Sequence, residues 1–298
     1  MNKQIRGVLL LLIATAIMAL ALVFQSSGMQ HIGPYTFQAC RCLLGAICML
    51  PIVAVADRNR NDNKNFLMRW ADPTLWKAGL LCGVPLGLGC MLQQVGLQYT
   101  EVGKSAFLTT MYIMIVPVIG LFVGKKPSIT VILSMLLALC GLYFLTCVDI
   151  LKIKLGDYIT LAGSLMFAAQ ILFVDRYAGR TDALRLSAIQ ALVCSIVAAI
   201  PMILTEFPSW NAISACAVPL LYTGCVSMGI GYSLQIVGQK DLEPTTAALI
   251  ISMESVFAVI FGALFLKEIL TKWELLGCGL MFIAVILSQI PVKKKTTA

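Results

Sequence analysis

Charged residues are scarce in this chain of 298 residues, in which Asp, Glu, Lys and Arg together make up 12%. A soluble domain uses about 25% of its residues in this way to cover its surface. Hydrophobic residues make up 59% of the chain, and the mean hydropathy is +0.91. Most of the surface must therefore face something other than water, so the composition predicts a protein embedded in a lipid bilayer.

Residues for metal and nucleotide chemistry are equally scarce. The sequence has a single histidine, His31, and its 11 cysteines form no C-x-x-C pair, so no ligand set for a metal ion is recognisable. The cysteines are scattered through apolar runs, where they are expected to pack as small apolar side chains. The sequence also has no Walker motif and no Asp-rich motif for a metal-bound diphosphate. We therefore expect no cofactor, no metal ion and no ATP-driven step.

What the chain has instead is ten apolar runs of about 20 residues, each long enough to cross a bilayer as a helix. They lie near residues 5–27, 35–56, 74–97, 102–123, 128–147, 156–177, 183–205, 214–238, 245–265 and 272–291. The loops between them are short, and the longest, 57–73, is polar. The sequence thus predicts an all-α integral membrane protein of ten transmembrane helices with no separate soluble domain.

Basic residues divide unequally between the two sides of these spans when the amino terminus is placed inside. Sixteen of the 22 Lys and Arg residues then fall on the inner side: Lys3, Arg6, Arg58, Arg60, Lys64, Arg69, Lys77, Lys125, Lys126, Arg176, Arg180, Arg185, Lys240, Lys293, Lys294 and Lys295. Five fall on the outer side, and Arg41 lies within a span. This bias predicts that both termini are cytoplasmic. Because the net charge of +8 is spread over many short loops, it indicates membrane topology and not a nucleic-acid partner.

The chain also contains an internal repeat at an offset of 142 residues. The segment GVPLGLGCMLQ, which begins at Gly83, aligns without gaps with CVSMGIGYSLQ, which begins at Cys225. The same offset continues through the next predicted span of each half. It pairs Gly87 with Gly229, Gly89 with Gly231, Gln93 with Gln235, and Tyr112 with Glu254.

The number of spans between equivalent positions predicts how the two halves are related. Equivalent helices lie five spans apart, and because five is odd the halves must be inverted across the bilayer. We predict a first repeat at 1–147, a linker at 148–155 and a second repeat at 156–292. Inverted helical repeats are an architecture of secondary transporters, which bind their substrate between the halves.

Three segments carry a family resemblance. They are GLQYTEVGKSAFLTTMYIMIVPVIGLFVGKK at 96–126, SMESVFAVIFGALFLKE at 252–268 and CRCLLGA at 40–46. Together they resemble the EamA-type members of the drug/metabolite transporter superfamily, and the resemblance covers essentially the whole chain. It implies a bundle of ten helices that moves small metabolites, often outward, across a bacterial inner membrane.

Within these segments, Pro117 matches the proline of the family's fourth helix, and Glu254 and Glu268 match its usual acidic positions in the second repeat. Two residues depart from the family pattern. Ser255 stands where the family often has proline, and Lys126 stands where the first repeat often ends in glutamate. Family members differ widely in substrate, so the resemblance implies transport but names no cargo.

The candidate substrate-binding residues begin with Glu254, which lies near the middle of a predicted span. An ionisable group at that depth costs at least about 2.5 kcal/mol, so it indicates a functional site by default. The alternative is a protonated or hydrogen-bonded carboxyl that packs helices. Its repeat mate Tyr112 either lines the same cavity or packs. Arg41 lies about seven residues into the second span. It can extend to the membrane surface, pair with a carboxylate of the substrate, or pair with Glu254.

Two glutamines and four glycines complete the candidates. Gln93 and Gln235 lie at mirror-related depths, where each can bond either to a neighbouring helix or to the substrate. Small residues allow helices to approach closely in membranes. We expect this role for Gly87, Gly89, Gly229 and Gly231.

The sequence favours a secondary transporter of small polar or amphipathic metabolites, amino-acid-like or related, that could act as an exporter. An integral membrane enzyme acting on a lipid-like substrate is the alternative, and a receptor is disfavoured because no output domain is present. The expected partners are a small-molecule substrate and the lipid bilayer, and a homodimer is compatible with the sequence. Proton-linked exchange, exchange driven by the membrane potential, and facilitated movement all stay open.

Overall fold

The computed structural model describes residues 3–58, 66–97, 99, 108–122, 127–146, 155–266 and 271–289. Within these ranges the chain is helical and contains no strand. The predicted all-helical membrane fold is confirmed at this level. The predicted linker at 148–155 lies outside the described residues except for Leu155, which begins a helix.

The first half contains α1 (Lys3–Gly28), α2 (Pro34–Arg58), α3 (Phe66–Trp70), α4 (Pro73–Leu97), α6 (Tyr112–Phe122) and α7 (Ile129–Thr146). The second half begins with α8 (Leu155–Tyr177), α9 (Ala183–Thr205), α10 (Trp210–Ala215) and α11 (Ala217–Leu221). It continues with η1 (Tyr222–Gly231), α12 (Tyr232–Gln239), α13 (Pro244–Ile251), α14 (Met253–Leu266) and α15 (Lys272–Ser288).

In the described part of the chain, seven helical stretches are long and apolar enough to cross a membrane. They are Lys3–Gln25, Pro34–Arg58, Pro73–Gly96, Leu155–Tyr177, Ala183–Thr205, Ala217–Gln239 and Pro244–Phe261. Leu108–Phe122 and Ile129–Phe144 are shorter apolar helices. Helices α4 and α13 each begin at a proline: α4 begins at Pro73, where Asp72 accepts a hydrogen bond from the backbone N–H of Thr74, and α13 begins at Pro244.

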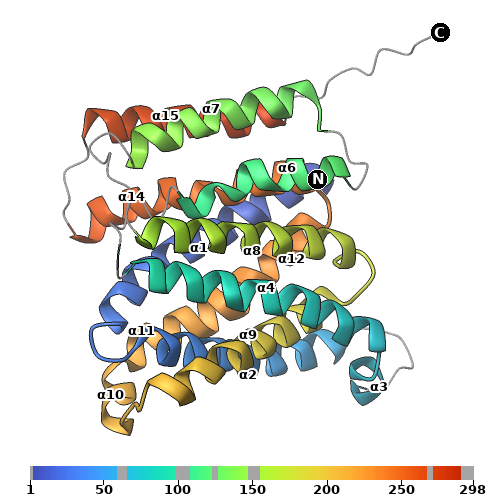
Figure 1. Ribbon diagram of the computed structural model, residues 1–298. Helices are drawn as coiled ribbons and strands as arrows, with labels where there is room; N and C mark the ends of the chain where they lie inside the picture. Colours follow the sequence, from blue (N-terminus) through green and yellow to red (C-terminus); the bar gives the residue numbers. More distant parts are fainter. Residues whose placement is uncertain are drawn as a thin grey trace.

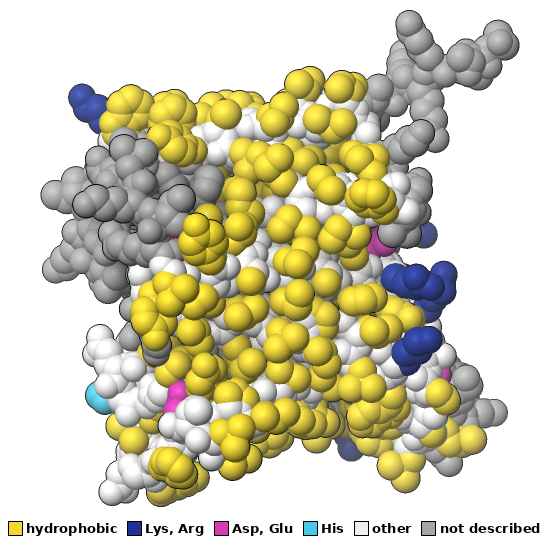
Figure 2. All heavy atoms as spheres, in the orientation of Figure 1, with side chains coloured by type: hydrophobic (Ala, Val, Ile, Leu, Met, Phe, Trp, Pro, Cys, Tyr) yellow, Lys and Arg dark blue, Asp and Glu magenta, His cyan; other side chains and the backbone are white. Residues whose placement is uncertain are grey.

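The long helices lie roughly side by side and stack into one bundle (Figure 1). α4 packs against α8 and α9, α2 packs against α9 and η1, and α1 packs against α12, α14 and η1. α6 packs against α8 and α13, and α7 packs against α15 at the edge of the bundle. Hydrophobic side chains cover most of the face in Figure 2, and the Lys and Arg side chains lie at its margins. Such a surface suits a surrounding of lipid.

The antiparallel helices α2 and α9 are tied to one another at both ends. At one end, which we call the Arg185 end, Arg185 is 1% exposed and forms an ion pair with Asp57 of α2. Asp57 also pairs with Arg69 at 3.2 Å, and the Arg185 guanidinium lies 5.4 Å from the centre of the Trp70 ring. At the opposite end, the Glu206 end, the carboxylate of Glu206 contacts the first residues of α2.

The four candidate glycines all face neighbouring helices, but not equally closely. A Cβ on Gly87 would lie 3.1 Å from Val197 Cβ of α9, and one on Gly89 would lie 3.2 Å from the Phe167 ring of α8. The nearest atoms to a Cβ on Gly229 would lie 3.6 Å away, on Gly224 and on Gly45 of α2. A Cβ on Gly231 would meet Ile17 of α1 at 3.4 Å. The chain is therefore packed more tightly around Gly87 and Gly89 than around Gly229 and Gly231.

Two predicted spans are not uniform α-helices. The span predicted at 214–238 is divided into α11, the π-helix η1 and α12, and the span predicted at 245–265 is interrupted at Ser252 between α13 and α14. π-Helical segments are rare and occur often at functional sites. Both irregular stretches border the cavity described next.

Candidate functional site

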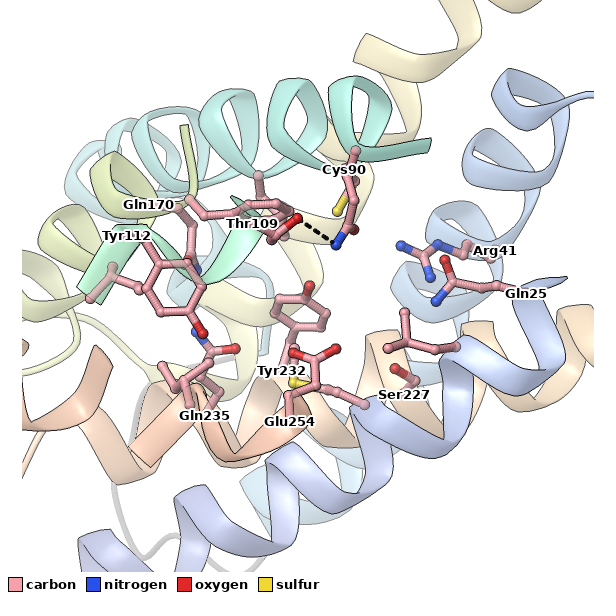
Figure 3. A pocket seen from close by; sticks show the side chains of 17 residues that line it. Gln25, Arg41, Cys90, Thr109, Tyr112, Gln170, Ser227, Tyr232, Gln235 and Glu254 are labelled. Carbon is pink, nitrogen blue, oxygen red and sulfur yellow. Dashed lines mark hydrogen bonds between the residues drawn. The ribbon is translucent and has the colours of Figure 1, made fainter. Parts of the chain in front are cut away.

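A cavity of about 60 Å³ lies at the centre of the bundle. It is lined by residues of α1, α2, α4, α6, α8, η1, α12, α13 and α14, and by Thr109 just before α6. All five residues proposed from the sequence as substrate contacts line it: Arg41, Gln93, Tyr112, Gln235 and Glu254. The fold thus brings together residues that are more than 200 positions apart in the sequence. Figure 3 shows the polar side chains converging on this space.

Arg41 is held inside the bundle and does not extend to the membrane surface. Its side chain is 5% exposed, and its Nε donates a hydrogen bond to Gln38 Oε1 at 2.7 Å. This bond uses Nε only, and the two terminal nitrogens of the guanidinium point into the cavity in Figure 3. The ion pairs formed between described residues lie at the Arg185 end, and none of them joins Arg41 to Glu254. Arg41 therefore neither extends to the membrane surface nor forms an ion pair with Glu254 in this structure.

Glu254 lies in the first turn of α14, directly after the break at Ser252. The first turn of a helix favours a negative charge, because its backbone N–H groups carry a partial positive charge. The break therefore explains in part how a carboxylate is accommodated deep in the bundle. Its carboxylate points into the cavity beside the Tyr232 side chain (Figure 3). The next residue, Ser255, shares a hydrogen bond of 3.3 Å with Thr110.

The two glutamines of the repeat have different surroundings. Gln93 Nε2 donates a hydrogen bond to Thr109 Oγ1 at 3.2 Å. Gln235 is 3% exposed, and its Oε1 has no hydrogen-bond partner among the described residues. Tyr112 is 5% exposed and lies across the cavity from Arg41 in Figure 3. One buried amide oxygen thus stands ready to accept a hydrogen bond.

Sequence reasoning missed several polar residues of the cavity, namely Gln25, Thr109, Gln170, Ser227 and Tyr232. A signal was present for some of them. Gln25 and Gln170 are polar residues within apolar runs, and Tyr232 is the repeat mate of Cys90, which also lines the cavity. Ser227 had no signal, because it lies in the π-helix that the sequence did not predict.

In the ranges that the structure describes, no group of three His, Cys, Asp or Glu side chains is placed to hold a metal ion. The cavity is lined by one guanidinium, one carboxylate, amides and hydroxyls, together with apolar side chains that include Met18, Leu22, Phe167 and Ile171. This set can bind a small molecule that has both charged and apolar parts.

The fold and the comparisons with known proteins together define a multi-pass membrane transporter. The EamA-like transporter family matches residues 5–147 and 154–289, and the chain belongs to this family. The family resemblance seen in the sequence is thereby confirmed.

Two curated relatives and one solved structure agree with this assignment. An "Uncharacterized transporter" of Archaeoglobus fulgidus is 27% identical over 269 residues, which cover 89% of this chain and 80% of the relative. The "Uncharacterized transporter YoaV" of Bacillus subtilis is 20% identical over 275 residues, which cover 90% of this chain and 91% of the relative. A solved structure titled "Crystal structure of protein" has the same fold, with a TM-score of 0.75, 14% identity and 96% of both chains covered.

Proposed function

We propose that the protein is a secondary transporter of small amino-acid-like metabolites that works by alternating access between two inverted repeats. The observation that carries the proposal is that Arg41 and Glu254 face one central cavity without pairing with one another. A guanidinium binds a carboxylate through parallel hydrogen bonds, and a carboxylate accepts hydrogen bonds from an amine. A molecule that carries both groups would satisfy both side chains once the cavity widens, with its carbon side chain against Met18 and Phe167.

The packing of the helices supports the two repeats at 1–147 and 156–292, joined by the linker at 148–155. Contacts between the two halves have counterparts in which each helix is replaced by its repeat mate. The contact of α4 with α8 corresponds to the contact of α12 and η1 with α1. The contact of α4 with α9 corresponds to that of η1 with α2, and the contact of α6 with α8 corresponds to that of α14 with α1. The pairs α2 with α9, α7 with α15 and α6 with α13 join equivalent helices to one another.

The lining of the cavity supports the same relationship. Four pairs of lining residues are separated by the offset of 142: Gln93 with Gln235, Cys90 with Tyr232, Thr109 with Ile251, and Tyr112 with Glu254. Two more, Met18 with Phe167 and Leu22 with Ile171, are separated by 149. A pseudo-two-fold axis would therefore run close to the cavity, where transporters built from inverted repeats bind their substrate.

The size of the cavity supports a conformational cycle. A cavity needs about 10–15 Å³ to hold one water molecule, and small-molecule sites usually have about 300–1,000 Å³. The volume of about 60 Å³ therefore suits a few waters and not an amino acid. Transport would require the bundle to widen towards one membrane face and then towards the other.

The proposed location is a bacterial inner membrane with both termini in the cytoplasm. Several arginines lie at or close to the helix termini of the Arg185 end: Arg58, Arg69, Arg176, Arg180 and Arg185. Since basic residues favour the cytoplasmic side, this end would face the cytoplasm and the Glu206 end would face outward. The family resemblance favours movement of the cargo out of the cell.

A matched series of ligands tests the proposed substrate class. Purified protein is heated with leucine, with the corresponding acid that lacks the amine, and with the corresponding amine that lacks the carboxylate. A ligand stabilises the folded state in proportion to its saturation, so weak binding registers at millimolar concentration. Leucine, or another amino acid in a wider panel, should raise the melting temperature more than its acid or amine. The best ligand should then cross the membrane of protein-containing liposomes.

Single substitutions should remove these preferences separately. Arg41→Gln should abolish discrimination between the amino acid and the amine, and Glu254→Gln should abolish discrimination between the amino acid and the acid. Glu243→Gln, which changes an exposed carboxylate at the start of α13, is the matched control. Equal responses to all three ligands, or flux that ignores both cavity substitutions, would exclude the proposed site.

A further inference from the structure

The two ends of the central cavity are closed by residues of different chemistry. Towards the Arg185 end, Val174 of α8 lies one turn beyond Gln170 and Ile171, and Ile236 of α12 follows Gln235. Both side chains are 0% exposed, and both belong to one apolar cluster. The cluster also contains Leu75, Ala78, Cys82, Tyr177, Ala178, Leu186, Ile189 and Val193. Four helices, α4, α8, α9 and α12, therefore pack through apolar side chains at these positions. The buried polar residues of the same helices at this end include Ser187, Gln190 and Gln239, and Gln190 accepts a hydrogen bond from Gln170 at 3.2 Å.

Towards the Glu206 end, two glutamines occupy the corresponding place. Gln25 of α1 lines the cavity, and Gln94 of α4 follows the lining residue Gln93. Gln94 Nε2 donates a hydrogen bond to Gln25 Oε1 at 3.3 Å. Gln94 is 2% exposed, yet its own Oε1 has no partner in the described part of the chain. The apolar cluster at this end consists of the buried residues Ile32, Phe37, Cys216 and Leu220. None of its described residues belongs to α4, so it does not extend to Gln94.

The repeat identifies these two closures as equivalent positions. Gln94 and Ile236 are related by the offset of 142, and Gln25 and Val174 by the offset of 149 that also relates Met18 to Phe167. This equivalence rests on the inverted repeat proposed above. The same pair of positions is thus a hydrogen-bonded pair of amides at one end and part of an apolar cluster at the other.

We propose that Gln25 and Gln94 form a polar gate at the Glu206 end of the cavity, through which water and the polar groups of the substrate pass. Opening the amide pair exchanges its hydrogen bond for bonds to water, and the buried Gln94 Oε1 gains a donor that it lacks when the gate is closed. Opening the other end exposes apolar side chains to water, which is unfavourable. The Glu206 end therefore opens more readily, and the glutamines offer donors and acceptors to a passing carboxylate or amine.

The gate can be tested without knowing the substrate, because Cys90 lines the cavity and is 3% exposed. A variant that keeps Cys90 as its only cysteine is treated with a charged, membrane-impermeant methanethiosulfonate reagent from each side of the membrane. A cysteine placed at the exposed Asn211 of α10 marks the face on which the Glu206 end lies. Cys90 should react at least about tenfold faster from that face than from the other, because the labelling rate follows the population of molecules whose cavity is open to that face.

Exchanging the two closures should exchange the accessibility. The double variant Gln25→Val/Gln94→Ile should slow labelling of Cys90 from the Glu206 face at least about tenfold, and Val174→Gln/Ile236→Gln should speed it from the Arg185 face. Gln30→Leu is the control, since it removes an exposed glutamine at the Glu206 end, just beyond α1. This control should leave both rates unchanged.

Two outcomes would overturn the gate. One is an unchanged labelling rate from the Glu206 face in folded Gln25→Val/Gln94→Ile, and the other is faster labelling of the wild-type cavity from the Arg185 face. Labelling does not depend on transport, so the gate and the transport function fail separately. A protein that moves amino acids but shows either outcome keeps its function and loses the gate.

Discussion

Glu206, which ends α9, caps the beginning of α2 through Thr36. The carboxylate of Glu206 accepts hydrogen bonds from the backbone N–H of Thr36 at 2.7 Å and from its hydroxyl group at 2.5 Å. It also accepts one from the backbone N–H of Tyr35 at 3.1 Å. The residue before α2 is Gly33, which has no side chain to act as a cap, and a Cβ there would collide with the Glu206 carboxylate. A residue of the second half thus supplies the cap that the first half lacks.

Removing this charge should loosen the Glu206 end. Glu206→Gln keeps the shape of the side chain but weakens hydrogen bonds to N–H groups that carry a partial positive charge. We expect a loss of about 1 kcal/mol in stability, as for other helix caps. Thermal unfolding of the purified protein measures the loss. Glu243→Gln is the control, because the side chain of Glu243 makes no capping bond to α13. Equal melting temperatures in both variants would contradict the capping role.

The Arg185 end should respond more strongly to a single substitution. Arg185→Met leaves the carboxylate of Asp57, whose side chain is 12% exposed, with Arg69 as its described ionic partner. Breaking one side of a buried ion pair costs about 3 kcal/mol, whereas replacing both sides is often tolerated. Asp57→Asn/Arg185→Met should therefore recover part of the loss caused by Arg185→Met alone. Thermal unfolding of the single and double variants gives the coupling energy, and strictly additive losses would show that the pair does not act as a unit.

The repeat-related glycines should differ in their tolerance of one added methyl group. Gly87→Ala would place its Cβ 3.3 Å from the backbone of Cys194, so α4 and α9 must separate slightly, whereas Gly229→Ala meets nothing nearer than 3.6 Å. We expect Gly87→Ala to lower the melting temperature and Gly229→Ala to leave it nearly unchanged. Leucine at either position should reduce transport by wedging the helices apart. Wild-type flux in both leucine variants would contradict a role in helix packing.

The orientation can be measured directly on intact cells. On a cysteine-free background, single cysteines at His31 and Asn211, both exposed at the Glu206 end, should react with an impermeant reagent added outside. A cysteine at the exposed Arg180, beside the Arg185 end, should react only after the membrane is opened. The reverse pattern would place both termini outside the cytoplasm.

Glu254 should be needed for transport and not for folding. Glu254→Gln keeps the shape and removes the charge, so the variant should insert normally and lose most of its substrate flux or the dependence of that flux on pH. Flux into liposomes at several pH values, together with the yield and melting temperature of the variant, separates the two effects. A folded Glu254→Ala variant with full flux and the wild-type pH profile would leave a packing role alone.

The sequence by itself determined the membrane environment, the helical class and the family. It also selected five polar residues that converge on one cavity, because an isolated charge or amide in an apolar run is costly unless it faces a polar space. The offset of 142 paired Tyr112 with Glu254, and both line the cavity. These features are local or periodic, so they can be read directly along the chain.

Only the tertiary structure decided how those residues are held and how the cavity is closed. Neither the break at Ser252 nor the π-helix Tyr222–Gly231 contains a proline, and both lie where helices pack against one another. The bond between Gln25 and Gln94 joins residues 69 positions apart, and the cap on α2 joins residues 170 apart. Hydrophobicity places each helix in the membrane, but the partner of each buried polar group depends on how the helices meet, and no single segment of sequence contains that information.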